Sequence, residues 1–146
     1  MEGTIEIRCP QTEVEWVKYY QLRYEVLRKP LGQLVGSERN EGDAIGVHFG
    51  LFRSGELSAI ARLDQVDERV AQTRFVAVRS DLQGKGLGKK IMLAVEDYAR
   101  QQGKDKMLLH ARDYALDFYL NLGYQIIEPS YKLFGVLQHF RMEKAL

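Results

Sequence analysis

Hydrophobic side chains recur at helical spacing near the start of the chain. Thr12 followed by Glu15 has the spacing of a capping box, which predicts the first turn of a helix. This helix carries apolar side chains in steps of three and four, at Trp16, Val17, Tyr20, Tyr24 and Leu27. Pro30 ends the pattern, because a proline disfavours helical backbone in the residue before it. The polar, glycine-bearing stretch Leu31 to Ile45 is then expected to be a loop or a short broken helix.

The pattern changes to alternation in the centre of the chain, which predicts three strands. These are Gly46 to Arg53, Glu56 to Val66 and Arg69 to Arg79. The third strand alternates at Val70, Gln72, Arg74, Val76 and Val78. Ser54-Gly55 is a hairpin signal, and all the connections are short, so the strands are expected to form an antiparallel meander.

Helical spacing returns in the second half, where helices and strands are expected to alternate. The predicted elements are a helix from Gly86 to Gln102 closed by Gly103, a buried strand from Met107 to Ala111, a helix from Ala115 to Leu122 capped by Gly123, and strands from Gln125 to Glu128 and from Gln138 to Lys144. We therefore expect an α/β fold with a mixed sheet, in one domain covering residues 1–146.

Composition narrows the function classes. With 45% hydrophobic and 28% charged residues, the 146-residue chain has an ordinary globular composition. A net charge of +1 disfavours nucleic acid as a partner, and no apolar run is long enough to predict a membrane span. Glu2, Glu6 and Arg8 break up the apolar centre that a signal peptide needs, and Cys9 is a single cysteine, so we expect a cytoplasmic protein.

The most informative segment is a strand that enters a glycine-rich turn and then a helix. Gly84, Gly86 and Gly88 would free backbone N–H groups at the positive end of the helix dipole, where they can cradle phosphate oxygens. Positive charge nearby comes from Arg79, Lys85, Lys89 and Lys90. The glycine spacing fits neither the Walker pattern nor the dinucleotide pattern, which disfavours a nucleotide-binding domain.

Two motifs resemble the GNAT acetyltransferases. Gln83, Gly86 and Gly88 match the Gln/Arg-x-x-Gly-x-Gly/Ala of that family's coenzyme A loop. Farther along, the family's Ala-x-x-x-Tyr-x-x-x-Gly-Phe/Tyr is matched at Ala115, Tyr119, Gly123 and Tyr124. A glycine-rich turn by itself is equally well explained as a helix start. Two motifs in the family's order and at its distance are far more specific.

The resemblance implies the fold and the coenzyme contacts. It implies a mixed, mostly antiparallel sheet flanked by helices, with a splayed strand pair that holds acetyl-CoA. The residues placed at the coenzyme are Phe75, Val76, Ala77, Val78, Gln83, Gly84, Lys85, Gly86, Leu87, Gly88, Lys89 and Arg112. The backbone N–H of Val78 is the implied donor to the thioester carbonyl. Arg112 stands where many members have asparagine.

The implied reaction moves an acetyl group from acetyl-CoA to an amine, which must first lose a proton. By its position, Tyr119 is the implied acid for the thiolate, although a core tyrosine on an apolar helix face fits the residues as well. Many members carry a glutamate on the strand before the loop that acts as the general base, but this chain has Thr73, Arg74 and Phe75 there. The alternative candidates for the base are His139, Glu128, His110 and Asp64, each of which also has a purely structural interpretation.

The acceptor is expected to be an amine on a small molecule or a protein. In the family the first helix, the loop after it and the last strands shape the acceptor pocket, here Leu22 to Glu41 and Tyr131 to His139. No metal is expected, because the histidines and Cys9 lack ligand spacing. A non-catalytic module that binds or senses coenzyme A is the alternative function, and the resemblance leaves a homodimer open.

Overall fold

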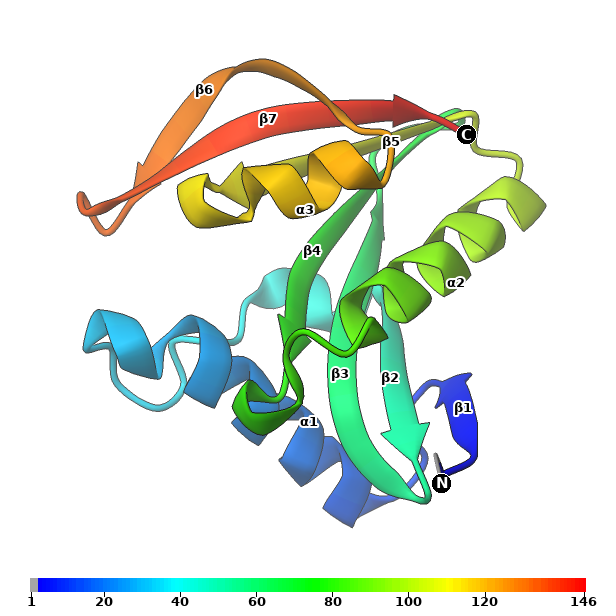
Figure 1. The fold of residues 1–146 in the computed structure, drawn as a ribbon, viewed down its shortest axis with the longest axis vertical. Helices are drawn as coiled ribbons and strands as arrows, with labels where there is room; N and C mark the ends of the chain where they lie inside the picture. The colour runs from blue at the N-terminus through cyan, green and yellow to red at the C-terminus, as the bar shows by residue number, and fades with distance from the viewer. Residues whose placement is uncertain (1–2) are drawn as a thin grey trace. The chain divides into compact units, whose positions relative to one another are not determined.

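The computed structural model describes residues 3–146, and its strands form a mixed sheet (Figure 1). The main elements are β1 (Ile5–Arg8), α1 (Glu13–Leu27), β2 (Val47–Arg53), β3 (Glu56–Gln65), β4 (Val70–Val78), α2 (Leu87–Gln101), β5 (Lys106–Arg112), α3 (Leu116–Asn121), β6 (Gln125–Leu133) and β7 (Leu137–Ala145). The order in the seven-stranded sheet is β1-β2-β3-β4-β5-β7-β6. β4 and β5 pair in parallel, whereas β1–β2, β2–β3, β5–β7 and β6–β7 are antiparallel. This confirms the predicted fold class.

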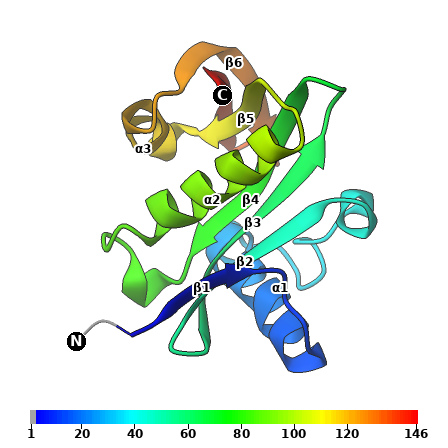
Figure 2. The same cartoon turned by 90° about the vertical axis from the view of Figure 1, so that its right-hand side faces the viewer.

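The elements differ from the sequence prediction mainly at the ends of the chain. β1 was not predicted, because four residues are too few to show a period; it pairs with β2, along which it lies in Figure 2. β6 runs five residues farther than expected, to Leu133. Short 3₁₀ turns occupy the expected irregular segments, at Lys29–Leu31 (η1), Glu41–Ala44 (η2), Ser80–Leu82 (η3) and Asp113–Ala115 (η4).

The chain divides into two compact units. The first contains the described residues up to Asp64 together with Phe75–Val95, and the second contains Gln65–Arg74 and Glu96–Leu146. β4 and α2 each contribute residues to both units. A single domain over residues 1–146 stays a prediction.

The first unit is built on α1, whose start follows the predicted cap. The Thr12 side chain accepts a hydrogen bond from the Glu15 amide at 3.2 Å. The return half of the box is displaced by one residue, because the Glu15 carboxylate accepts from the Gln11 amide at 2.8 Å and from Arg8. A satisfied first turn fixes where the helix begins, and therefore which side chains face the core.

The core of the first unit is formed by α1 and the ends of three strands. Its buried residues are Tyr19, Leu22, Leu27, Phe52, Leu57, Ile60 and Ala77. Val17, which the pattern assigned to the apolar face of α1, is 55% exposed. The buried stripe instead follows Tyr19, Arg23 and Leu27, which are four residues apart, with an arginine in the middle.

Burial alternates along part of β4, and the buried residues lie between the alternating positions named from the sequence. Ala71, Thr73 and Ala77 are buried, whereas Val70 and Val76 are only half-buried. Side chains at the even-numbered and at the odd-numbered positions of β4 both include uncharged residues. Alternation alone therefore did not identify which of the two sets is buried. The smaller side chains are the ones that face inward.

The second unit contains the parallel pairing of β4 with β5, which is short. The parallel β4–β5 ladder runs from Val70 opposite Lys106 to Gln72 opposite Leu108. β5 continues to Arg112, which pairs with His139 of β7 on its other side. α3 runs beside the long β6–β7 hairpin (Figure 1). No helix in the described part of the chain is long and apolar enough to cross a membrane.

The second unit also buries a carboxylate. Glu96 on α2 is fully buried and accepts hydrogen bonds from the Tyr124 hydroxyl at 2.6 Å and from Lys144 Nζ at 2.8 Å. An ion pair of this kind holds the helix to the sheet, because neither charge tolerates the interior alone.

We predict that Glu96→Ala lowers the free energy of unfolding by about 3–5 kcal/mol, because it leaves the Lys144 ammonium without its partner. Asp97→Ala is the matched control. Its carboxylate is 69% exposed and pairs with Arg100 at the surface, so its loss is expected to cost less than ~1 kcal/mol. Urea denaturation followed by circular dichroism measures both variants. Equal midpoints for the two variants would show that the buried pair contributes nothing.

Candidate functional site

The glycine-rich loop of the first unit is an exposed arch between two buried anchors. Leu82 and Leu87 are buried, and the residues between them, Gln83–Gly86, are exposed. Gly84 and Gly86 both have φ of +80°, in the left-handed region that favours glycine. A Cβ on either glycine would meet nothing within 4 Å. The loop therefore presents bare backbone to an open side.

The amides of this loop have no partners from the described residues. The first hydrogen bond of α2 is donated by the Lys90 amide to the Gly86 carbonyl, at 3.1 Å. The amides of Gly86 and Gly88 donate to no protein acceptor among residues 3–146. Unsatisfied N–H groups at a helix start carry partial positive charge, and they suit an anion such as a diphosphate. The Gln83 side chain donates to the Val78 carbonyl at 3.2 Å and ties the loop to the end of β4.

One expected source of positive charge is already neutralised. The Arg79 guanidinium donates to Asp81 at 2.7 and 3.0 Å and pairs with Glu56 at 3.4 Å. The hydrogen bonds that Arg79 donates to Asp81 raise the pKa of Arg79, so this arginine belongs to a surface ion-pair network. Lys85, Lys89 and Lys90 are exposed, and they remain as the cations of the loop.

Phe75 occupies an unusual backbone position in β4. Its φ is +55°, a left-handed conformation that costs a bulky residue roughly 1–3 kcal/mol. Its ring is contacted by three guanidinium groups, whose central carbons lie 4.2 Å (Arg23), 4.9 Å (Arg62) and 5.6 Å (Arg28) from the ring centroid. Cation–π attraction of buried arginines holds the ring, and with it the strained backbone of β4.

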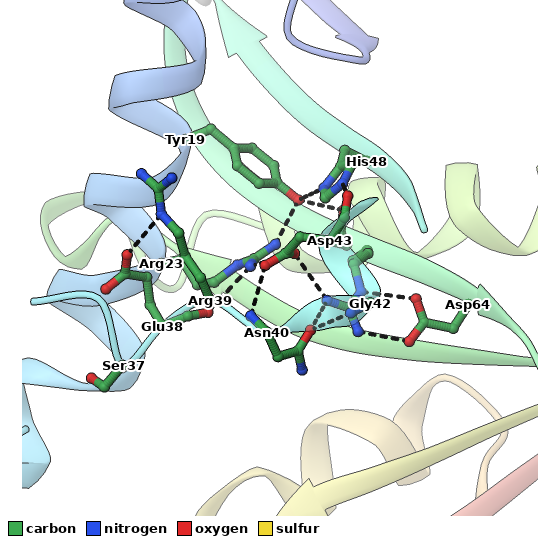
Figure 3. Close-up of polar contacts among 12 residues, drawn as sticks. Tyr19, Arg23, Ser37, Glu38, Arg39, Asn40, Gly42, Asp43, His48 and Asp64 are labelled. Atoms are coloured by element: carbon green, nitrogen blue, oxygen red, sulfur yellow. Dashed lines mark hydrogen bonds and ion pairs between the residues drawn. The ribbon is translucent and has the colours of Figure 1, made fainter. Parts of the chain in front are cut away.

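Arg23 and Arg62 are fully buried. Asp43 lies beside Arg23 (Figure 3). Asp43 Oδ1 accepts from Arg23 Nη1 at 2.7 Å and from Arg62 Nη1 at 2.9 Å. The Nε and Nη2 atoms of Arg62 donate to the two carboxylate oxygens of Asp64, each at 2.8 Å. Asn40 accepts another bond from Arg62 at 2.6 Å. The network fastens the loop after α1 to β3.

Protonation in this network follows from burial and charge. Burial opposes ionisation of Asp43, but the Asn40 amide and the two guanidiniums outweigh it and lower the pKa of Asp43. His48 on β2 is buried, and burial lowers its pKa. Its Nδ1 lies 2.8 Å from the Tyr19 hydroxyl and its Nε2 lies 2.9 Å from the Asp43 carbonyl oxygen. Asp64, one of the candidate bases, has both carboxylate oxygens engaged by Arg62.

In the second unit, Tyr119 lies on α3 among aromatic rings. It is 9% exposed, and its ring meets Phe118 and Tyr124 edge to face, with centroids 4.9 and 5.8 Å away. Burial raises its pKa, so the phenol keeps its proton at neutral pH. Its hydroxyl makes no hydrogen bond to the described residues. It is therefore both a core aromatic and an unpaired proton donor.

Two candidate bases meet at one aromatic ring. Tyr131 stacks on His139, with centroids 4.4 Å apart and planes 14° apart, and it also contacts the His110 ring at 5.5 Å. His139 is buried, and its Nδ1 lies 3.1 Å from the Leu137 carbonyl oxygen. Glu128, the other candidate, is exposed on β6, opposite Arg141 in the β6–β7 register.

Arg112, at the end of β5, donates to the Tyr114 hydroxyl at 2.9 Å. The structure thus gathers Tyr119, His110, His139, Glu128 and Arg112 in the second unit. The glycine loop and Phe75–Val78 belong to the first. Among the described residues there is no group of three or more His, Cys, Asp or Glu side chains that could hold a metal ion.

The arginine network was not predicted from the sequence, although one signal was available. Arg23 stands on the apolar stripe of α1, four residues after Tyr19 and four before Leu27. A charged residue on a buried stripe requires a buried partner of opposite charge. That partner, Asp43, is twenty residues away, in the loop.

Comparison with known proteins points to one family. The model of the acetyltransferase (GNAT) family matches residues 4–124. N-alpha-acetyltransferase 80 from Mus musculus is 39% identical over 67 residues, which are 46% of this chain. Those residues are only 20% of the mouse protein, so the similarity covers about a fifth of its length.

Solved structures show the same fold. An acyl-CoA N-acyltransferase from Pseudomonas aeruginosa superposes with a TM-score of 0.80 at 22% identity, covering 97% of this chain and 99% of that one. An aminoglycoside 6′-N-acetyltransferase complexed with coenzyme A gives 0.80 at 14% identity, covering 97% and 96%.

We predict that Asp43→Asn lowers the free energy of unfolding at pH 7 by about 3–5 kcal/mol, because it leaves two buried guanidiniums without their shared anion. The folded-state pKa of Asp43 is lowered, so its contribution is complete above the unfolded pKa near ~3.9 and is lost as the pH falls through the folded value. The difference in the free energy of unfolding between the wild type and Asp43→Asn, the stability deficit of the variant, should therefore become smaller in acid.

Urea titrations at pH 7 and pH 3 measure this deficit. Glu41→Gln is the matched control, because Glu41 is an exposed carboxylate in the same 3₁₀ turn. A deficit of the same size at both pH values would contradict an ionised Asp43 as the cause.

Proposed function

The chain belongs to the GNAT acetyltransferase family, and on that basis we propose that it is an N-acetyltransferase that moves the acetyl group of acetyl-CoA to an amine. Membership implies acyl transfer from acetyl-CoA. The observation that best supports the proposal in this chain is the exposed glycine arch, whose amides have no partners among residues 3–146. The exposed Cys9, alone in the sequence, fits a reducing cytoplasm as the proposed location.

In this proposal the first unit holds the coenzyme. The amides of Gly86 and Gly88 bind the diphosphate, and the exposed Lys85 and Lys89 add charge. The other loop contacts are Gln83, Gly84 and Leu87. The residues present fit the ligand, because a Cβ at Gly84 or Gly86 would meet only open space, so oxygen atoms can approach the backbone there.

The thioester is proposed to lie along the end of β4, where Phe75, Val76, Ala77 and Val78 offer backbone groups. The Val78 N–H is the proposed donor to the carbonyl oxygen as negative charge develops there. Phe75 supports this role through its left-handed backbone, which turns the peptide groups beside it out of the regular strand pattern. The three arginines around its ring fix that geometry before substrate binds.

The second unit supplies the proton-transfer groups in this proposal. Acetyl-CoA provides a thioester carbon that an uncharged amine attacks, with a thiol as leaving group. Tyr119, kept protonated by burial, donates a proton to the departing sulfur. The amine's proton passes to one of three side chains of this unit, namely His139, Glu128 or His110. Arg112 contacts the coenzyme.

The acceptor is proposed to be an amine on a small molecule or a protein. A coenzyme A-binding module without turnover is the second candidate. It is favoured because Thr73, Arg74 and Phe75 stand on the strand where a glutamate that accepts the proton was expected. Incubation with acetyl-CoA and a broad panel of amines, followed by detection of free thiol, separates the two. Thiol release with any acceptor supports the enzyme. Coenzyme A binding without release across the panel favours the module.

We predict that Gly86→Glu weakens coenzyme A binding by at least about a hundredfold, because a carboxylate would oppose the diphosphate at the helix start. Gly103→Glu is the matched control. Its φ of +84° is close to the +80° of Gly86, so a side chain strains the backbone similarly at both positions. An added Cβ at Gly103 also meets nothing within 4 Å. Calorimetry measures binding, and circular dichroism checks the fold. If both variants bind as the wild type does, the phosphate site lies elsewhere.

We predict that Tyr119→Phe lowers kcat by roughly a hundredfold and leaves the Kd for coenzyme A unchanged, because only the proton donor is lost. Tyr98→Phe removes the hydroxyl of another tyrosine, on α2, and should leave kcat unchanged. Steady-state thiol release with the best acceptor gives kcat for each protein. A Tyr119→Phe protein with wild-type kcat would reduce Tyr119 to a core aromatic.

A further inference from the structure

His110 is a partly buried histidine with a nitrogen that lacks a partner. Its Nδ1 is sealed from solvent and has no hydrogen-bond partner among residues 3–146. Burial lowers the pKa of this imidazole, and the guanidiniums of Arg141 and Arg74 lower it further, so the ring is neutral at pH 7. A bound molecule can reach only the other ring nitrogen, Nε2, which offers a lone pair when Nδ1 carries the hydrogen of the neutral ring.

His110 lies just beyond the point where strand pairing ends. The β4–β5 ladder stops at Gln72 opposite Leu108, and His110 is the second residue of β5 after that point. On its other side β5 remains paired, with His110 directly opposite Arg141 of β7. The strand edge beside His110 is where an extended ligand can continue the ladder.

His139 does not share this character. Its Nδ1 is within hydrogen-bonding distance of the Leu137 carbonyl oxygen, and its ring is covered by Tyr131 at 4.4 Å. The same Tyr131 ring leans on His110 at 5.5 Å, tilted by 55°. Tyr131 therefore covers one side of the His110 ring, and its stacking on His139 fixes the position of the Tyr131 ring.

The charges around His110 are mostly positive. Arg74 acts on it from β4 and Arg141 from β7, while Tyr131 and His139 contribute rings. Arg141 donates its Nε to Glu143 at 2.8 Å, and the same carboxylate pairs with Lys106 at 2.5 Å. The Nη nitrogens of Arg141 have no partner among the described residues. Glu128, opposite Arg141 in the β6–β7 register, forms no ion pair with it in the described chain.

We propose that His110 takes the proton from the acceptor's amine, and that the acceptor binds as a zwitterion whose anionic group pairs with Arg141. A simple ammonium would be repelled by two guanidiniums beside His110. An ammonium on a molecule that also carries a carboxylate or a similar anion is accepted, because the anion meets the open fork of Arg141. This inference rests on the proposed acetyltransferase function and names its base and its acceptor class.

His110 Nε2, the ring nitrogen that is not sealed, accepts one proton from the ammonium, and the lone pair of the amine nitrogen forms the bond to the acetyl carbon. The C–S bond breaks, and the sulfur leaves with the electron pair and receives a proton from Tyr119. The new amide nitrogen loses its second proton, which returns to the Tyr119 oxygen. The imidazolium then releases its proton to water.

The test uses His110→Gln and Arg141→Gln in the full chain, with matched acceptors that carry either a free carboxylate or its neutral amide. We expect His110→Gln to lower kcat/KM by about a hundredfold and to flatten the acid limb of its pH profile. We expect Arg141→Gln to raise KM for the carboxylate acceptor at least about tenfold and to leave the amide acceptor unchanged. Arg69→Gln, at an exposed arginine paired with Asp105, should match the wild type.

Each outcome decides the inference. An unchanged acid limb in His110→Gln overturns it, as does loss of the limb in His139→Gln alone. If the wild type prefers the amide acceptors to the carboxylate acceptors, the proposal that the acceptor binds as a zwitterion is wrong. If no acceptor releases thiol, the proposed function fails and this inference fails with it. If His110→Gln does not fold, NMR of the wild type replaces it, and a His110 ring resonance unmoved by a carboxylate-bearing amine also overturns the inference.

Discussion

Two guanidinium groups are buried in the first unit, and a charge removed from water persists only where opposite charge meets it. Asp43 meets both Arg23 and Arg62, and Asp64 closes the remaining side of Arg62. Because Asp43 comes from the irregular segment after α1, the same requirement gives that segment a fixed path. The planar faces of both guanidinium groups pack against the ring of Phe75 in cation–π contacts. The conformation of β4 at its left-handed residue therefore depends on charge neutralisation in the core.

The glycine loop depends on that strand in turn. β4 ends at Val78, whose carbonyl accepts from the Gln83 side chain, and the arch of Gly84 and Gly86 begins beyond it. The backbone N–H groups of this arch have no partners in the part of the chain that the structure describes, whereas the nearby Arg79 is engaged by Asp81 and Glu56. The contrast matters for function, because it is the backbone, with exposed lysines beside it, that remains available to an anion.

The second unit repeats the contrast between satisfied and unsatisfied groups. Glu96 is buried with a tyrosine hydroxyl and a lysine on its carboxylate, which is a structural arrangement. His110 is partly buried, its Nδ1 has no partner among the described residues, and the positive charges of Arg141 and Arg74 lower its pKa. The network at Asp43 and the face at His110 thus have different roles. The first pairs buried charges with one another, although Arg23 Nε has no hydrogen-bond partner in the described chain. The second places an imidazole beside a strand edge where the β4–β5 pairing has ended.

The sequence by itself determined what depends on neighbouring residues. Thr12 and Glu15 marked the start of α1, the period of α2 marked its extent, and Gln83, Gly86, Gly88 and Tyr119 carried the family likeness. These features are local, because helix caps, periods and turns are decided within a few residues.

Only the tertiary structure decided which face of β4 is buried, that Phe75 is left-handed, that Arg23 meets Asp43, and that Tyr131 joins His110 to His139. Each of these depends on packing or charge pairing between segments far apart in the chain, and no local pattern encodes which distant partner a buried charge or ring will find.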